Sequence, residues 1–161
     1  MCRNSVKWRY RSDANFAWDS GFEIPEDLVF LDATGKVRLI LEQGGRITVT
    51  REYAWNGCSP KGCLFDFAVG TPDGVVHVRT GRPKTYFASM VHDALYQFLD
   101  ADSPITRRQA DDAFLRLLAE SDFAPRGLYW LFVRLFGRAV WQATRARRDW
   151  QGTSVTAKDL M

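Results

Sequence analysis

The chain has 161 residues, which is about the length of one domain, and 46% of them are hydrophobic, so bulk disorder and a multidomain array are excluded. Its formal net charge of +3 is too small to indicate sequence-specific binding of nucleic acid. Apolar runs are much shorter than the roughly 20 residues that span a bilayer, and we expect no signal peptide. The three cysteines form no disulfide pattern, so we expect a protein made in a reducing cytoplasm.

The first half of the chain, residues 1–85, consists mainly of predicted strands. They alternate apolar and polar side chains or are rich in β-branched residues, and glycines or a proline separate them. The predicted strands are residues 5–11, 36–42, 46–53, 64–69 and 75–80. Two glycines between the second and third of these predict a β-hairpin, because glycine accepts a positive φ.

The second half, residues 86–150, has apolar residues at helical spacing. Three helices are predicted, over residues 87–99, over residues 106–120 and from residue 126 toward residue 150. Thr106 and Gln109 form a capping box at the start of the second helix. A polar tail, residues 151–161, follows. We therefore predict an α+β fold in a single domain, residues 1–161, whose first two helices form an antiparallel pair.

The first two predicted helices place a histidine opposite an acidic residue. His92 and Tyr96 lie one turn apart on the first helix. Asp111 lies within the apolar stripe of the second helix, whereas Asp112 points in nearly the opposite direction. A buried carboxylate is costly unless it is paired, so we expect Asp111 to contact His92. The other histidine, His77, has no acidic residues nearby in the sequence, and we expect a structural role for it.

A histidine held by a carboxylate has a chemical use. The carboxylate fixes the imidazole tautomer and leaves the second ring nitrogen free to take a proton from water or from a nucleophile. Asp93 projects to another side of the helix, where it can hold a divalent cation together with carbonyl oxygens of a loop. The pair of His92 and Asp111 can equally be a structural hydrogen bond between two packed helices, and both interpretations remain open.

Two short motifs on these helices resemble the paired-helix active site of secreted-type phospholipases, especially the cysteine-poor version in parvovirus capsid proteins. The motifs are His92-Asp93-x-x-Tyr96 and Ala110-Asp111-x-x-Phe114. The resemblance implies that His92 is the base that activates water. It also implies that Asp111 orients His92 and that Tyr96 supports Asp111.

The same resemblance implies a calcium ion. Asp93 is the carboxylate ligand in this comparison, and Asn56 and Gly57 belong to the loop that supplies further ligands. The loop is less rich in glycine than in the phospholipases, and the disulfides that clamp their helices are absent. Cys58 and Cys63 in this loop make only half of a zinc site, so we expect no zinc.

The order of motifs along the chain also resembles a phage and prophage family of unknown function. The shared motifs, within about residues 45–141, are Asn56-Gly57-Cys58-Ser59-Pro60, Ser89-x-Val91-His92-Asp93-x-Leu95-Tyr96, Arg107-x-x-Ala110-Asp111 and Arg134-Leu135-Phe136-Gly137. This resemblance implies a protein made in the host cytoplasm, with phage structural proteins or the host envelope as partners. We expect a hydrolase of an envelope ester or amide, or, as the alternative, a virion or accessory protein that keeps the helix pair as a scaffold.

The third predicted helix is basic and amphipathic. Arg134, Arg138 and Arg145 share one face, and no acidic residue occurs between residues 126 and 148. Another face is lined by Leu128, Leu131, Leu135 and Ala139. Such a helix is typical of binding to an anionic membrane surface. The alternative is a core helix whose basic face is solvated.

Overall fold

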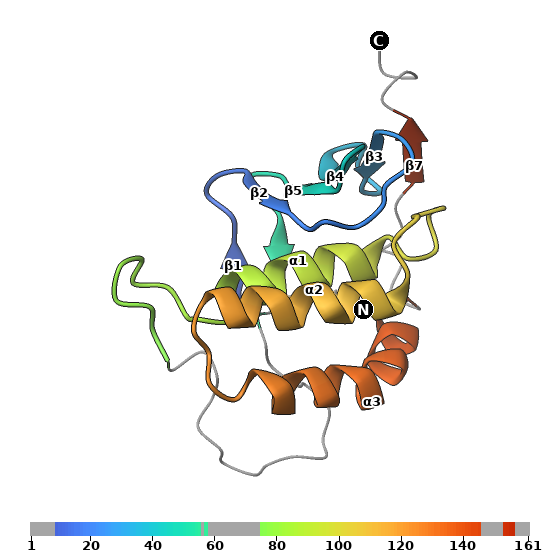
Figure 1. Ribbon diagram of the computed structural model, residues 1–161. Helices are drawn as coiled ribbons and strands as arrows, with labels where there is room; N and C mark the ends of the chain where they lie inside the picture. Colours follow the sequence, from blue (N-terminus) through green and yellow to red (C-terminus); the bar gives the residue numbers. More distant parts are fainter. Residues whose placement is uncertain (1–8, 56, 58–74, 146–152, 157–161) are drawn as a thin grey trace, which may run out of the picture.

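The computed structural model describes residues 9–55, 57, 75–145 and 153–156 (Figure 1). The strands are β1 (Tyr10–Arg11), β2 (Phe16–Asp19), β3 (Leu28–Leu31), β4 (Val37–Glu42), β5 (Arg46–Val49), β6 (Ala54–Trp55) and β7 (Thr153–Thr156). The helices are α1 (Tyr86–Gln97), α2 (Arg107–Glu120) and α3 (Arg126–Arg145). Antiparallel sheets therefore precede the helices, and the predicted α+β class is confirmed.

A five-stranded antiparallel sheet has the strand order β2-β5-β4-β3-β7. The predicted hairpin is present as β4 and β5, and its turn contains Gly44 and Gly45 at φ values of 97° and 95°. At Gly45 a side chain is excluded, because a Cβ atom would lie 2.6 Å from the carbonyl oxygen of Phe22. Part of the predicted polar tail forms β7, which pairs with β3 at the edge of the sheet.

Three predicted strands differ from the structure, and one lies outside the described residues. The strand predicted over residues 46–53 is shorter, because β5 ends at Val49 and a turn follows it. The strand predicted over residues 75–80 is wrong: this segment makes turns and a single bridge between Val76 and Pro83. Its apolar residues have no sheet to pack against, and Val78 is 99% exposed. Of residues 5–11, the described part contributes only β1, which pairs with β6. The strand predicted over residues 64–69 lies outside the described residues.

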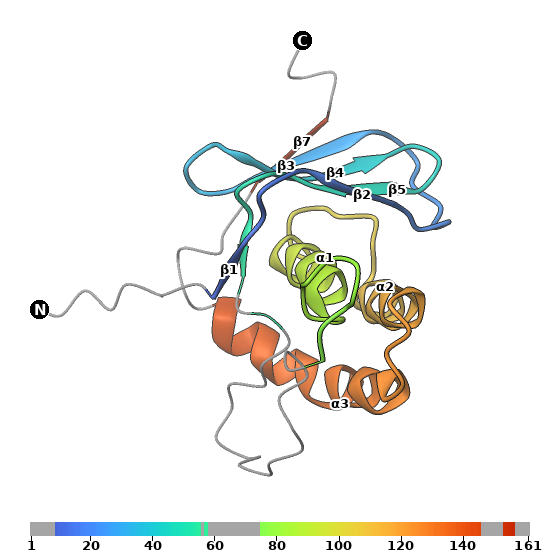
Figure 2. The same cartoon turned by 90° about the vertical axis from the view of Figure 1, so that its left-hand side faces the viewer.

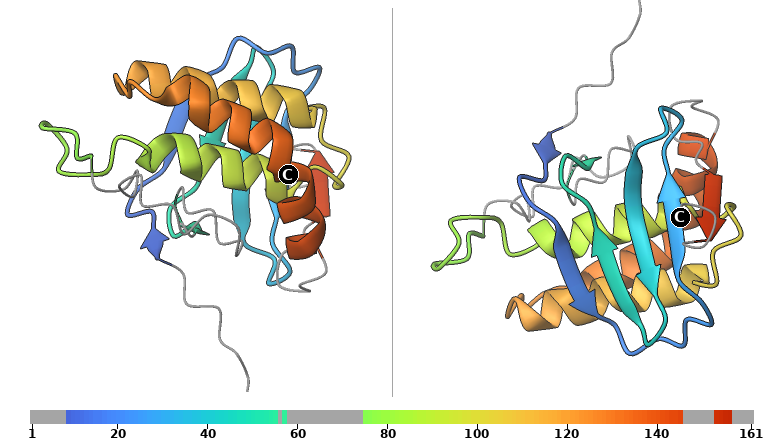
Figure 3. Two further views of the ribbon diagram at one scale, coloured as in Figure 1. Left: turned by 90° about the horizontal axis from the view of Figure 1, so that it is seen from below. Right: turned by 90° about the horizontal axis from the view of Figure 1, so that it is seen from above.

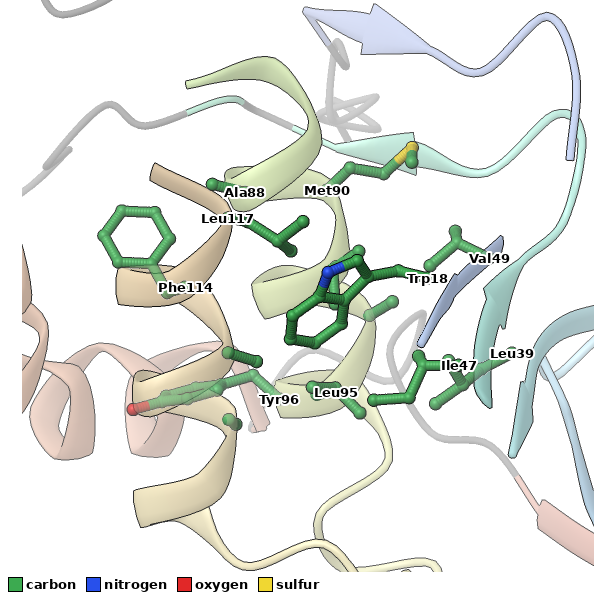
Figure 4. Packing of buried hydrophobic residues seen from close by; sticks show 14 of the residues in the cluster. Trp18, Leu39, Ile47, Val49, Ala88, Met90, Leu95, Tyr96, Phe114 and Leu117 are labelled. Carbon is green, nitrogen blue, oxygen red and sulfur yellow. The ribbon is translucent and has the colours of Figure 1, made fainter. Parts of the chain in front are cut away.

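The hydrophobic core lies between the five-stranded sheet and α1 (Figures 2 and 4). Alternate residues of β4 and β5 point toward the helices, because successive side chains of a strand face opposite sides of its sheet. The fully buried side chains of the sheet and of α1 include Phe30, Leu39, Leu41, Ile47, Val49, Met90 and Leu95. The sheet thus packs against one side of the helix pair and supports it.

The first two helices pack against each other and run in opposite directions (Figures 1 and 3). The capping box that starts α2 is present, because the backbone N–H of Gln109 donates to Thr106 and the backbone N–H of Thr106 donates to the Gln109 side chain. The third helix, α3, packs against α2 on the side remote from the sheet (Figure 2). Among the described residues, no helix is both long and apolar enough to cross a bilayer.

Candidate functional site

Asp111 is the centre of a buried polar cluster that joins all three helices. Its side chain is fully buried, yet it accepts three hydrogen bonds. His92 Nε2 lies 3.0 Å from Asp111 Oδ1, and the Tyr96 hydroxyl donates to the same oxygen at 2.6 Å. Arg134 Nη1 donates to Asp111 Oδ2 at 2.8 Å. The structure therefore brings together His92, Tyr96 and Asp111, as the helical spacing predicted.

Local packing fixes the orientation of the imidazole. His92 and Tyr96 are four residues apart on α1, and their ring centroids are 4.1 Å apart. Phe114, one turn after Asp111 on α2, also packs against the His92 ring, and the centroids of these two rings are 5.1 Å apart. Because these contacts and the Asp111 hydrogen bond act together, the ring has one favoured orientation, with Nε2 toward Asp111 and Nδ1 away from it.

Arg107 and Gly137 hold α3 close to the cluster. Arg107 Nε donates to the Tyr96 hydroxyl at 3.1 Å, and its Nη2 donates to the backbone carbonyl oxygens of Val133 and Arg134. A Cβ atom at Gly137 would lie 2.7 Å from the Tyr96 hydroxyl oxygen, so the buried glycine is what allows this approach. The sequence motifs Arg-x-x-Ala-Asp and Arg-Leu-Phe-Gly contain these residues, but their contacts were not predicted.

The position of Arg134 corrects the predicted basic face of α3. Arg134 was placed with Arg138 and Arg145 on a face toward solvent or a membrane. In the structure it points inward to Asp111, and its side chain is only 32% exposed. Arg138 is exposed, as expected, and the side chain of Arg145 lies outside the described residues. Arg134 and Arg138, four residues apart on α3, therefore have different environments.

The charges in the cluster shift the pKa of each member. Burial tends to lower the pKa of His92, but the hydrogen bonds and negative charges of Asp111 and Asp93 outweigh it and raise this pKa above the ordinary value of 6.5. Burial tends to raise the pKa of Asp111, but hydrogen bonds from His92, Tyr96 and Arg134 outweigh it and lower this pKa. Asp111 is therefore an anion at neutral pH, and it favours the imidazolium form of His92.

On its other side, His92 faces a second carboxylate. Asp93 Oδ1 lies 3.8 Å from His92 Nδ1, a distance that leaves the nitrogen without a close hydrogen bond to this carboxylate. Burial raises the pKa of Asp93, and burial together with the charge of Asp93 raises the pKa of Tyr53. The Tyr53 hydroxyl is buried, and among the described side chains it makes no hydrogen bond. Sequence patterns gave no signal for Tyr53, since tyrosines are common in strand segments.

The predicted calcium ligands are only partly within the described residues. Gly57 has a φ of 74°, a left-handed conformation that suits glycine in a tight loop. Asn56, Cys58 and Cys63 lie outside the described residues. In the part of the chain that the structure describes, no group of three or more His, Cys, Asp or Glu side chains is arranged to hold a metal. Calcium at Asp93 stays a prediction.

The second histidine lies in a turn rather than in the predicted strand. His77 Nδ1 accepts a hydrogen bond from the backbone N–H of Arg79 at 3.2 Å. Its contact is local and its segment is exposed, so it offers a natural comparison for His92.

A family model described as "Protein of unknown function (DUF1353)" matches residues 46–133, which is more than half of the chain. The chain belongs to the DUF1353 family. Neither the curated proteins nor the solved structures contain a match. The DUF1353 match begins in β5 and ends within α3, so it includes His92, Tyr96 and Asp111. The match stops one residue before Arg134, the residue of α3 that donates a hydrogen bond to Asp111.

Proposed function

We propose that this DUF1353 protein is a hydrolase in which His92 is the general base. The observation that carries this proposal is the pairing of His92 Nε2 with the buried carboxylate of Asp111, which leaves Nδ1 available on the opposite side of the ring. A general base must be oriented and must have one unprotonated nitrogen, and the pair meets the first requirement directly. The second is met at pH values above the raised pKa of His92.

The reaction would proceed by attack of water on a carbonyl carbon. His92 Nδ1 takes one proton from the water molecule while the water oxygen forms a bond to the ester or amide carbonyl carbon. The tetrahedral intermediate then expels the alcohol or amine, which receives that proton from Nδ1. Asp111 stays ionised throughout and stabilises the imidazolium. The products are an acid and an alcohol or amine, and His92 returns to its neutral form.

Asp93 lies beside His92 Nδ1, and its charge also acts on the buried Tyr53 hydroxyl. A buried hydroxyl without a hydrogen bond is costly, and a water molecule or a substrate oxygen at this place would relieve that cost. The Asp93 carboxylate and the Gly57 backbone carbonyl are oxygen donors of the type that calcium prefers. A calcium ion bound there would supply positive charge near the carbonyl oxygen of the substrate.

The substrate class follows from the resemblance to phage proteins. We infer an ester or amide of the host envelope, in a protein made in the host cytoplasm, because the order of motifs along the chain is similar to that of a phage and prophage family. Phospholipid and peptidoglycan are the two substrates to test.

A specific observation favours a second function. Among the described residues, the Asp111 carboxylate accepts its hydrogen bonds from side chains within the helix bundle, and Arg107 adds two to the backbone of α3. Such a network also suits a scaffold whose buried polar groups fix how the helices pack. In that case the protein is a virion or accessory component that works by binding.

The two histidines allow a matched experiment. We expect the wild-type chain to hydrolyse phospholipid or peptidoglycan and the His92→Gln variant to lose about 10²–10⁴-fold of this rate, since that is what a general base contributes. The His77→Gln variant should retain full activity, because His77 lies in an exposed turn. A parallel assay with excess calcium and with a calcium chelator tests the predicted ion. Absence of hydrolysis under all these conditions, in a folded wild-type protein, would support the scaffold instead.

A further inference from the structure

The outward side of α3 is apolar, although it is exposed. Leu128, Leu131 and Leu135 are 50%, 46% and 64% exposed, and they recur every three or four residues. Phe132 and Phe136 lie beside them and are 39% and 45% exposed. We call these five residues the outer face of α3. α3 is the helix farthest from the sheet (Figure 2).

The inward side of the same helix is already occupied. Gly137 is buried against Tyr96, and Tyr129 and Val133 pack against the hydrophobic core. Arg134 reaches Asp111. The leucines of the outer face therefore contribute little to the core. A surface helix ordinarily turns a polar face to solvent, and a contiguous apolar patch marks an interaction site.

Positive charge borders the outer face. Arg138 follows Leu135 by three positions, so the two side chains are neighbours on the helix surface. The sequence of α3 contains no acidic residue. A second copy of this chain would bring the same arginine toward its counterpart, which opposes self-association. An anionic surface, in contrast, complements both the charge and the apolar row.

We propose that the outer face of α3 binds the surface of an anionic membrane. In this arrangement α3 lies in the plane of the interface, its leucines enter the boundary between headgroups and acyl chains, and Arg138 pairs with lipid phosphates. The binding is interfacial, because α3 does not have the length and apolarity of a spanning helix. It does not depend on the proposed hydrolysis, so binding can be measured in a variant without activity.

The test is cosedimentation of the full chain carrying His92→Gln with two kinds of vesicle, phosphatidylcholine alone and phosphatidylcholine mixed with phosphatidylglycerol. We expect binding to the mixed vesicles that weakens as salt rises, because salt screens exposed charges. Leu131→Gln with Leu135→Gln should weaken binding by more than about tenfold. Arg138→Gln should weaken it by about fivefold, the contribution of one arginine near an anionic leaflet.

Matched variants elsewhere on the surface serve as controls. Val78→Gln removes a fully exposed apolar side chain, and Arg108→Gln removes an exposed arginine of α2, whose side chain is 79% exposed. Neither should alter binding. Equal or negligible sedimentation with both vesicle types overturns the proposal, as does unchanged binding of the leucine variant. A concentration-dependent dimer that the leucine variant abolishes, without vesicle binding, would assign the face to a second copy instead.

Discussion

The interior of the molecule has two packing interfaces that differ in chemistry. We call the interface between the sheet and α1 the apolar seam, and the interface among the three helices the polar seam. Between the sheet and α1 the buried side chains are apolar, as at Leu39, Ile47 and Met90. Between α1, α2 and α3 the interior contains His92 and Asp111, with arginines at the margin. Apolar side chains of similar volume generally stabilise a fold as well as a buried ion pair does or better. The polar seam is therefore best explained by a role other than stability alone, and perturbed pKa values often accompany such roles.

The largest expected effect separates two adjacent aspartates of α2. Asp111→Asn keeps the shape of the side chain but removes the charge that fixes the His92 tautomer, so activity should fall by about 10⁴-fold. Asp112 was expected to point away from Asp111, but it too contacts α3, where it accepts a hydrogen bond from Trp130. Asp112→Asn should be nearly neutral, because an asparagine oxygen can also accept this hydrogen bond. Rates of hydrolysis, normalised to folded protein by circular dichroism, decide the outcome. Greater damage from Asp112→Asn would show that the orienting residue is wrongly assigned.

A smaller effect compares two glycines of α3. Gly137→Ala places a Cβ atom against the Tyr96 hydroxyl, so we expect a loss of about 1–3 kcal/mol in the free energy of unfolding. Gly127→Ala meets no atom within 4 Å and should stabilise α3 by up to about 1 kcal/mol, the difference in helix propensity. Urea denaturation measures both. If Gly137→Ala were neutral, the close approach of α3 to Tyr96 would not contribute to stability.

The smallest effect is a pH dependence of stability that only the polar seam should show. The pKa of His92 is raised on folding, so its protonation stabilises the folded state fully below about pH 6.5, and this stabilisation is lost as the pH rises through the folded-state pKa. His92→Gln should therefore cost more free energy of unfolding at acidic than at alkaline pH. Leu41→Ala, in the apolar seam, should cost the same at each pH. Urea denaturation across this pH range measures both, and a pH-independent cost for His92→Gln would contradict the raised pKa.

Helical spacing was enough to predict the central pair of the site. Asp111 is a charged residue within an apolar stripe, and the neighbouring helix offers His92 at the matching height, so local periodicity determines their contact. The phase of α3 was not predictable in the same way. The sequence of α3 has apolar residues on both sides of the helix. The side with Gly137 packs inward, because only a residue without a Cβ atom fits against the Tyr96 hydroxyl, and this contact is visible only in the structure.

The strands of the sheet were only partly predictable from local turns. The hairpin of β4 and β5 was predicted from its glycines. Leu28–Leu31 also forms a hairpin, with β4, but its turn at Gly35 was not recognised in the sequence. Phe16–Asp19 pairs instead with β5, which lies far along the chain. In Phe16–Asp19 the exposed residue Ala17 is itself apolar, so the sequence does not show the alternation that the burial of Phe16 and Trp18 follows. Tyr53 was missed for a related reason, because its importance comes from the neighbouring Asp93 rather than from its own sequence context.

The pairing of β7 with β3 has a consequence for solubility. In β3, Leu28, Val29 and Phe30 are all buried, which makes this strand among the most apolar of the sheet. Without β7, its outer edge would present unpaired N–H and C=O groups beside those apolar side chains, a template on which a strand of another molecule can add. β7, which follows the helices in the chain, thus covers this edge of β3. The edge strand of the sheet is then β7, whose sequence Thr-Ser-Val-Thr is more polar than that of β3.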